Sequence, residues 1–206
     1  MQAHEFVESY VTEDAILQSA RESAQELGLT PIGPGAGATL RLLAAAGNAR
    51  AVVEVGTGTG VSGLWLLRGM RSDGILTTID IEAEHQRMAK RVFAAAGYSP
   101  SRTRIITGHA LEVLPRLADG AYDLVLLDAD PVEHSAYAAE ARRLLRVGGV
   151  LVINNALAGG RVGDPAARDH ATVTIREMVK ALRDSDEWTS ALVPAGDGLL
   201  CAVKRG

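Results

Sequence analysis

The chain has 206 residues, of which 47% are hydrophobic and 22% are charged, and this composition is typical of a single globular domain with its own core. A formal net charge of -4 argues against a general affinity for nucleic acid, because phosphates bind to basic surfaces. Cys201 is the only cysteine, which excludes an internal disulfide and a thiolate zinc site and fits a reducing cytoplasm.

The first 50 residues are predicted to form a helical cap. They begin without the basic and apolar stretches of a signal peptide. An apolar helical face precedes Gly28, and its residues are Ile16, Ala20, Ala24 and Leu27. We expect residues 31–37, which are rich in proline and glycine, to form a loop. No stretch of the chain approaches ~20 uninterrupted apolar residues, so we expect a soluble, cytoplasmic protein without a membrane partner.

From residue 51 onward, short β-branched runs alternate with runs of helical period, which is typical of βαβ units. The predicted strands cover residues 51–56, 75–80, 104–108, 122–128, 150–154, 190–194 and 198–204. Two helical faces are expected to stop at Gly97 and Gly148, and the second consists of Tyr137, Ala141, Leu144 and Leu145. Too few residues separate the last two strands for a parallel crossover, so we expect an antiparallel hairpin.

The predicted fold class is therefore α/β, with a single doubly wound, mostly parallel seven-stranded sheet of the Rossmann-like kind. The C-terminal hairpin closes this sheet, and the N-terminal helices cap it. We expect one domain over residues 1–206, with the cap in residues 1–50 and the core in residues 51–206.

A glycine-rich loop follows the first predicted strand and precedes an apolar helix. It reads Gly-Thr-Gly-Thr-Gly-Val-Ser-Gly from Gly56 to Gly63. Glycine permits a tight turn and a close approach of ligand to backbone, and the helix start offers free N–H groups. Asp80 ends the next strand, where its carboxylate could accept hydrogen bonds from two ribose hydroxyls or cap the following helix. These features predict a nucleoside cofactor site.

Two cofactors are compatible with this loop. Gly58, Gly60 and Gly63 satisfy G-x-G-x-x-G and Asp80 follows about 20 residues later, as in nicotinamide dinucleotide sites. Glu54, just before the glycines, favours a cationic cofactor such as S-adenosylmethionine (SAM) over a pyrophosphate. The chain also lacks the Tyr-x-x-x-Lys spacing of short-chain reductases and has no Gly-Lys pair for a phosphate-binding loop. SAM is therefore favoured, and an NAD(P)-dependent reductase is the weaker alternative.

Six segments, in this order and spacing, resemble the bacterial and plant O-methyltransferases of the catechol and caffeoyl-coenzyme A type. They are VEVGTGTGVS, TTIDIE, GHALEVLPRL, YDLVLLDAD, LLRVGGVLVINNAL and PAGDGLLCAVK. The resemblance spans nearly the whole chain, and it implies SAM as the cofactor and a homodimer as the assembly.

The resemblance also implies cofactor contacts at Ile32, Glu54, Gly56, Thr57, Ser62, Asp80, Ile81, His109, Ala110 and Asp128. Glu54 is expected to approach the methionine or ribose part of SAM, and Ser62 to bind its carboxylate. Asp80 and Ile81 are expected to hold the ribose and adenine. His109 and Ala110 are expected to border the adenine, while the loop near Ile32 closes over the site.

The acceptor side departs from the family pattern. Asp128 and Asp130 are the predicted catalytic residues, and the resemblance implies a role for Asp128 with metal and substrate. Pro131 stands where the family has a lysine proposed as the base, and Asn154 stands where the family has an aspartate. The predicted metal ligands are Asp128, Asn154 and Asn155, but the lost carboxylate would weaken binding of Mg²⁺ or another divalent cation.

The sequence therefore predicts a SAM-dependent O-methyltransferase that acts on a small hydroxylated or phenolic acceptor, with metal dependence left open. The alternative is a SAM-binding protein whose catalysis is weakened by Pro131 and Asn154. His134 is a further candidate for the base, although we expect a solvent-facing helix position for it.

Overall fold

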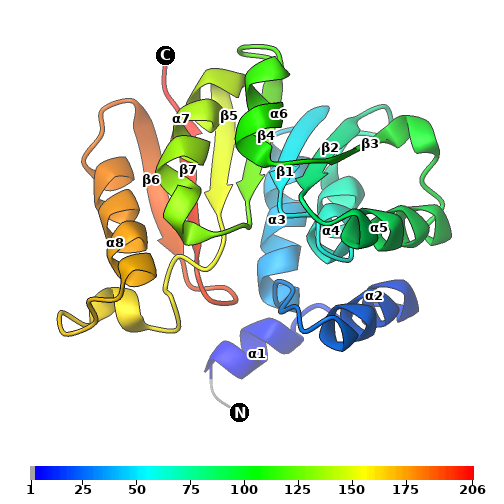
Figure 1. Cartoon of the computed structure of the whole chain (residues 1–206), viewed down its shortest axis with the longest axis horizontal. Coiled ribbons are helices and arrows are strands. Elements are labelled where there is room, and N and C mark those ends of the chain that lie inside the picture. The colour runs from blue at the N-terminus through cyan, green and yellow to red at the C-terminus, as the bar shows by residue number, and fades with distance from the viewer. Residues whose placement is uncertain (1–2) are drawn as a thin grey trace.

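The computed structural model describes residues 3–206 and contains one seven-stranded sheet (Figure 1). The strand order is β3-β2-β1-β4-β5-β7-β6. The strands are β1 (Ala51–Val55), β2 (Ile75–Asp80), β3 (Thr103–Thr107), β4 (Tyr122–Leu127), β5 (Leu145–Ile153), β6 (Trp188–Val193) and β7 (Leu199–Lys204). Strands β1 to β5 pair in parallel, whereas β7 is antiparallel to both β5 and β6. The predicted fold class and the closing hairpin are confirmed.

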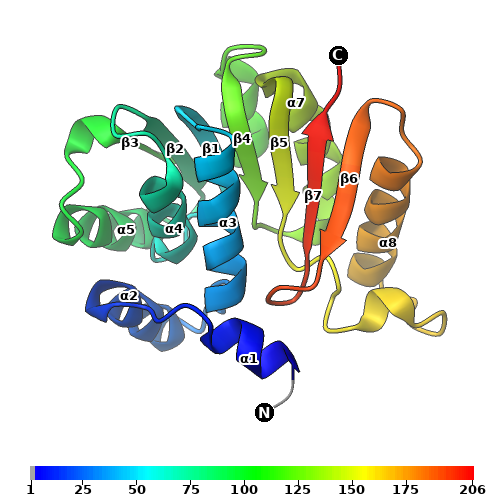
Figure 2. The same ribbon diagram turned by 180° about the vertical axis from the view of Figure 1, so that it is seen from behind.

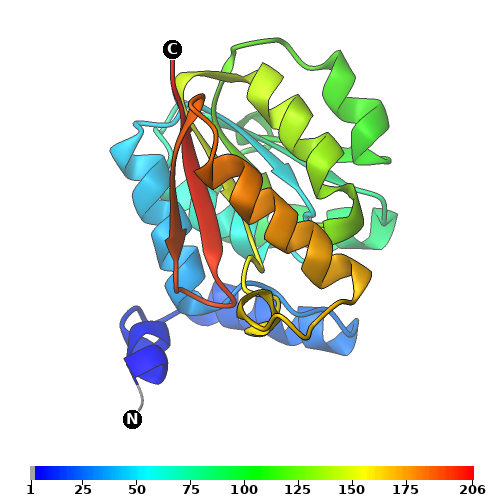
Figure 3. The ribbon, with the colours of Figure 1, turned by 90° about the vertical axis from the view of Figure 1, so that its left-hand side faces the viewer.

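Helices cover both faces of this sheet. They are α1 (Ala3–Ser9), α2 (Ala15–Glu26), α3 (Pro34–Ala46), α4 (Val61–Gly69), α5 (Ala83–Ala95), α6 (Ala110–Val113), α7 (His134–Leu144) and α8 (His170–Arg183). Short 3-10 segments are η1 (Pro100–Arg102), η2 (Leu114–Arg116), η3 (Pro131–Glu133) and η4 (Arg161–Gly163). Figure 2 shows α3, α4 and α5 on one face, and the edge-on view of Figure 3 places α7 and α8 on the other. Within residues 3–206, none of the helices combines the length and apolarity needed to cross a membrane.

The core forms two layers because successive strand residues point to opposite faces of the sheet. Val52 and Leu124 are buried in the layer beneath α3, α4 and α5. Val53 and Val125 are buried in the layer beneath α7 and α8. A sheet that is covered on both faces exposes the carboxyl ends of its strands only at one edge, and this edge is where ligands bind in doubly wound folds.

The expected loop over residues 31–37 is wrong in its second half. Helix α3 begins at Pro34, whose fixed φ suits the first position of a helix and whose missing N–H costs nothing there. The Glu8 carboxylate accepts a hydrogen bond from the Gly35 N–H at 2.9 Å and so satisfies the new helix start. Leu40 and Ala44 of α3 are fully buried, so this helix is a layer of the core as well as part of the N-terminal cap.

The boundary between α7 and β5 also differs from the prediction. Leu145 has an extended backbone and pairs with Tyr122, so β5 begins five residues before the predicted start at residue 150. Gly148, with φ of +77°, lies inside β5 where the pairing with β4 shifts register, and it is not a helix stop. Gly97, with φ of +83°, follows α5 in the left-handed conformation expected after a helix.

Candidate functional site

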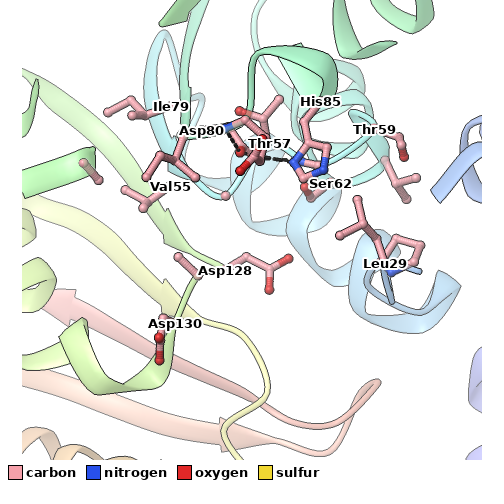
Figure 4. A pocket seen from close by; sticks show the side chains of 18 of the residues that line it. Leu29, Val55, Thr57, Thr59, Ser62, Ile79, Asp80, His85, Asp128 and Asp130 are labelled. Atoms are coloured by element: carbon pink, nitrogen blue, oxygen red, sulfur yellow. Dashed lines mark hydrogen bonds and ion pairs between the residues drawn. The ribbon is translucent and has the colours of Figure 1, made fainter. Parts of the chain in front are cut away.

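A pocket of about 450 Å³ opens at the carboxyl ends of β1, β2 and β4 (Figure 4). It lies where the strand order reverses between β1 and β4, which is the ligand-binding position of doubly wound sheets. Its lining comes from residues 29–32, 55–59, 61–62, 79–82, 108–110 and 128–130, with Ala24, His85, Glu133 and Tyr137. Of the predicted cofactor residues, all line this pocket except Glu54.

The loop between β1 and α4 follows a path that glycine alone permits. Gly56 has φ of +95°, and a Cβ there would lie 1.9 Å from the carbonyl oxygen of Asp128. Gly60 has φ of +91° at the start of α4, and its Cβ would lie 3.0 Å from the Cα of Ala89. Because these glycines have no side chains, the loop can pack closely against the end of β4 and against α5, and its backbone faces the pocket.

Asp80 joins the ends of β1 and β2. Its Oδ2 accepts a hydrogen bond from the Gly58 N–H at 2.9 Å, and its Oδ1 accepts one from the Glu82 N–H at 2.9 Å. His85 Nδ1 lies 3.2 Å from the same Oδ1. The N-cap of α5 is Glu82 rather than Asp80, so the helix-cap interpretation of Asp80 is wrong. Oδ2 accepts from the Gly58 N–H and can accept a second hydrogen bond from a hydroxyl, whereas Oδ1 already faces both the Glu82 N–H and His85 Nδ1.

Glu54 lies beneath the loop rather than in the pocket wall. Its side chain is fully buried and accepts hydrogen bonds from Ser62 Oγ at 2.5 Å and Thr78 Oγ1 at 2.6 Å. Thr78 Oγ1 is in turn 2.6 Å from Thr57 Oγ1. Glu54 thus connects the pocket-lining Thr57 and Ser62 from below, and a direct contact between Glu54 and a cofactor stays a prediction.

The buried position changes the chemistry of this carboxyl group. Burial raises the pKa of Glu54 from 4.5 to about 8, since the charged form loses its hydration. The hydrogen bonds from Ser62 and Thr78 act in the opposite direction, and the negative charges of Asp128 and Asp80 add to the increase in this pKa. Burial therefore favours the protonated form of Glu54 more than in an exposed glutamate.

Asp128 lines the pocket at the end of β4. It directly follows β4, and its N–H donates to the Val55 carbonyl oxygen at 2.8 Å, which holds it beside β1. The side chain of Asn154 donates from Nδ2 to Asp128 Oδ1 at 2.9 Å. Burial raises the pKa of Asp128 to about 6, and the hydrogen bond from Asn154 opposes this increase. Figure 4 shows the Asp128 carboxylate pointing into the pocket and the Asp130 side chain, which also lines the pocket, at a separate position.

The neighbours of Asp128 have structural partners. Asp130 is exposed, and its Oδ1 accepts a hydrogen bond from the Val132 N–H at 3.0 Å, where it caps η3. His134 is 1% exposed and does not face solvent, so our expectation for its position is wrong. Its Nε2 lies 3.2 Å from the Ala129 carbonyl oxygen, and burial lowers the pKa of the ring. His134 does not line the pocket, which removes it as a candidate base.

The residues at the predicted metal position do not fit a divalent cation. Magnesium and calcium sites rely on carboxylate oxygens, and Asp128 is the single carboxylate among the three predicted ligands. One Asp128 oxygen faces the Asn154 N–H group, while Asn155 is exposed with a left-handed φ of +57°. Among residues 3–206, no group of three or more His, Cys, Asp or Glu side chains is arranged to hold a metal ion.

One polar group in the pocket wall and one contact that holds the loop at Ile32 were missed at the level of sequence. Glu133 accepts a short hydrogen bond from the Tyr137 hydroxyl and lies 3.2 Å from His109 Nε2. Arg21 of α2 donates to the carbonyl oxygen of Ile32 at 2.8 Å, and its guanidinium also pairs with Glu13 at 2.7 Å. The Glu133–Tyr137 contact spans four residues and could have been found from helical spacing, whereas the His109–Glu133 contact joins segments that meet only in the folded chain.

The fold and the pocket define a Rossmann-like α/β domain with a nucleoside-type site at its switch point. Comparison with known proteins shows which family within this fold class the chain resembles. The profile of the O-methyltransferase family matches residues 7–205. A probable O-methyltransferase of Mycobacterium tuberculosis is 55% identical over 197 residues, covering 96% of this chain and 88% of the relative.

Solved structures agree with this similarity. A Corynebacterium glutamicum protein superposes with a TM-score of 0.90 at 36% identity, covering 98% of this chain and 94% of that chain. The O-methyltransferase TomG of Streptomyces achromogenes, solved in complex with SAM, gives a TM-score of 0.88 at 29% identity, with 100% of both chains covered. An O-methyltransferase of Bacillus cereus in complex with SAH gives 0.86 at 25% identity, covering 98% and 96%. The present chain belongs to the O-methyltransferase family.

Proposed function

We propose that this chain transfers the methyl group of SAM to an oxygen atom of a small hydroxylated or phenolic acceptor. The observation that carries the proposal is the position of the Gly56 loop between two carboxylates, Asp80 and Asp128, in one pocket. The described lining of this pocket contains acidic residues but no lysine or arginine. Such a site favours a ligand with an ammonium and a sulfonium group over a pyrophosphate, which supports SAM over a nicotinamide dinucleotide.

Each end of the cofactor has a counterpart in the pocket. Asp80 Oδ2, which accepts from the Gly58 N–H, retains an acceptor position for a ribose hydroxyl. The adenine would lie near Ile81, which is 63% exposed, and near Ala110 at the start of α6. The methionine carboxylate would lie near Ser62 at the start of α4, where backbone N–H groups are available.

The transfer requires alignment more than any other contribution from the protein. SAM supplies a methyl group on a positively charged sulfur. The acceptor oxygen attacks the methyl carbon, a C–O bond forms, and the C–S bond breaks with its electron pair on sulfur. The hydroxyl proton leaves the acceptor, so the products are a methyl ether, S-adenosylhomocysteine and a proton. In this proposal the Asp128 carboxylate accepts a hydrogen bond from the attacking hydroxyl and orients it.

The experiment is to incubate the purified protein with SAM and a panel of phenols and catechols, and to quantify S-adenosylhomocysteine and methylated product. Calorimetry with SAM and NADH separates the two cofactor interpretations. Product formation supports the proposal and excludes a SAM-binding protein without catalysis. Binding of SAM without turnover across the panel supports the weakened-enzyme alternative, and preferential binding of NADH contradicts the choice of cofactor.

We also propose that two copies of the chain associate through α1 and α3. These helices border an apolar cavity of about 670 Å³, beside which Phe6, Tyr10 and Leu42 are 60%, 78% and 66% exposed. Protruding rings and a hollow on one surface allow twofold self-complementary packing. Light scattering after size exclusion should give a dimer for the wild type and for Val147→Asp, a control at an exposed position on β5, and a monomer for Leu42→Asp. A monomeric wild type contradicts this assembly.

A cytoplasmic location and a small-molecule acceptor complete the proposal, with neither nucleic acid nor a membrane as a partner. The net charge of -4 argues against nucleic acid as a partner, and the single Cys201 fits a reducing cytoplasm. Fractionation of cells that express the chain checks the location. Retention of the purified chain on immobilised DNA or on lipid vesicles would contradict the choice of partner.

A further inference from the structure

The Asn154 side chain forms a fixed partner for Asp128. Asn154 follows the last residue of β5, and its N–H donates to the Leu127 carbonyl oxygen at 3.0 Å. This bond continues the pairing of β4 and β5 up to the pocket edge. The side chain is 4% exposed, and the atom that faces Asp128 Oδ1 at 2.9 Å is the amide nitrogen. The opposite amide orientation would place two oxygens with no proton between them at this distance, and they would repel.

This hydrogen bond occupies Oδ1, one of the two Asp128 oxygens that could ligate a cation. A second carboxylate at residue 154 would repel Asp128, and the pair would need a cation or a shared proton between them. The Asn154 carboxamide has nearly the same shape but supplies an N–H donor and no charge. A buried carboxylate requires such a partner, because an unpaired charge away from water is costly.

The other Asp128 oxygen remains available on the pocket side. Asp128 lines the pocket, and its carboxylate points into it (Figure 4). Asn154 does not line the pocket, so it reaches the ligand space only through Asp128. Asn154 is therefore placed to fix the direction of the carboxylate without contacting an acceptor itself.

We infer that Asn154 takes the place of a divalent cation as the partner of Asp128, and that methyl transfer by this chain is independent of divalent cations. The inference rests on the proposed function. Asn154 is a positioning residue that holds one Asp128 oxygen and leaves the other for the acceptor hydroxyl. The atoms balance as in the transfer described above: the C–S bond breaks, the C–O bond forms, and the hydroxyl proton leaves to water.

The first test measures metal binding without any methyl transfer. Wild type, Asn154→Asp and Asn154→Ala are freed of metal with a chelator, checked by circular dichroism, and titrated with Mn²⁺ by electron paramagnetic resonance. We expect Asn154→Asp to bind Mn²⁺ at least about tenfold more tightly than the wild type, because it restores a carboxylate pair. Asn154→Ala, which adds no charge, should bind no more tightly than the wild type. Equal affinity of wild type and Asn154→Asp overturns the inference.

If Asn154→Asp fails to fold, Mn²⁺ binding is instead compared between the wild type and Asp128→Asn. Saturable Mn²⁺ binding by the wild type that Asp128→Asn abolishes would also overturn the inference. Absence of such binding supports it.

The second test follows S-adenosylhomocysteine formation in chelator and after addition of Mg²⁺. The wild type should retain its rate within about twofold under both conditions, whereas both Asn154 variants should lose kcat in chelator. Mg²⁺ should restore Asn154→Asp and leave Asn154→Ala impaired, which a purely structural role of Asn154 would not produce. Loss of wild-type activity in chelator that Mg²⁺ restores overturns the inference. SAM calorimetry without added metal tests the proposed function separately, so the two failures are distinguishable.

Discussion

The cofactor side and the acceptor side of the pocket are built in different ways. On the cofactor side, the Gly56 loop, Asp80 and the buried Glu54 hold one another through backbone N–H groups and hydroxyls from β1, β2 and α4. On the acceptor side, a single hydrogen bond from Asn154 fixes Asp128, while Asp130 is exposed and caps η3. The first region is fixed by neighbouring segments of the fold. The second depends on individual side chains, and substitution can change its chemistry without rebuilding the fold.

Gly56→Ala should produce the largest effect, because Gly56 lies where the two regions touch. The new Cβ would lie 1.9 Å from the Asp128 carbonyl oxygen, at a backbone φ of +95°. We expect a loss of about 2 kcal/mol or more in the free energy of unfolding, and loss of SAM binding. Denaturant titration and calorimetry measure the two effects.

Gly97→Ala is the matched control for this prediction. It has a similar φ of +83° with nothing within 4 Å of the new Cβ. It should cost about 1 kcal/mol and leave SAM binding intact. Equal losses in the two variants would mean that backbone strain, rather than the contact between β1 and β4, decides the outcome.

Asp128→Ala tests the acceptor side alone. We expect kcat to fall about 100-fold, because the carboxylate that orients the attacking hydroxyl is lost, while the affinity for SAM changes by less than about tenfold. Asp130→Ala removes a neighbouring carboxylate that caps η3 and should lower kcat by less than about tenfold. Steady-state kinetics and SAM calorimetry give both quantities. Similar losses of kcat in the two variants would contradict the distinction between these aspartates.

The buried acid on the cofactor side makes stability depend on pH. The folded pKa of Glu54, about 8, lies above the ordinary value of 4.5, so the folded state holds a proton that the unfolded state releases. Glu54 therefore stabilises the fold fully below pH 4.5, and this stabilisation is lost as pH rises toward 8. The slope approaches about 1.4 kcal/mol per pH unit between these values.

Glu54→Gln should flatten this dependence, since glutamine keeps the shape and cannot ionise. The measurement is the difference in free energy of unfolding between wild type and Glu54→Gln at several pH values from 5 to 8. Taking the difference removes the contributions of Asp128 and His134, whose pKa values also shift on folding. Parallel curves for the two proteins would show that Glu54 is ionised in the folded state.

Arg21→Ala should have the smallest effect and concerns the loop that covers the cofactor side. Loss of the hydrogen bond to the Ile32 carbonyl oxygen should raise the KM for SAM roughly fivefold, with little change in kcat. Arg87→Ala, which removes an exposed ion pair with Glu84 on α5, serves as the control and should leave KM unchanged. An unchanged KM in Arg21→Ala would show that the loop is held in place by packing alone.

The sequence by itself determined the α/β class, the mostly parallel sheet, the closing hairpin and the glycine-rich loop after the first strand. These features follow from short-range properties: alternation of β-branched and helical runs, and glycines at positions with positive φ. Asp80 could be placed at the pocket for the same reason, because the carboxyl ends of parallel strands share one edge. Each inference needs only neighbouring residues and the geometry of the sheet.

Only the tertiary structure decided what surrounds each side chain. Glu54 stays a predicted cofactor contact, but only the packing of α4 and β2 shows that it lies beneath the loop with a raised pKa. His134 is buried at the first position of α7, and Asn154, which follows β5 and lies 26 residues further along the chain, donates to Asp128. Burial and hydrogen bonding depend on segments that are distant in sequence. The charge state of an acid and the partner of a carboxylate therefore cannot be determined from local pattern.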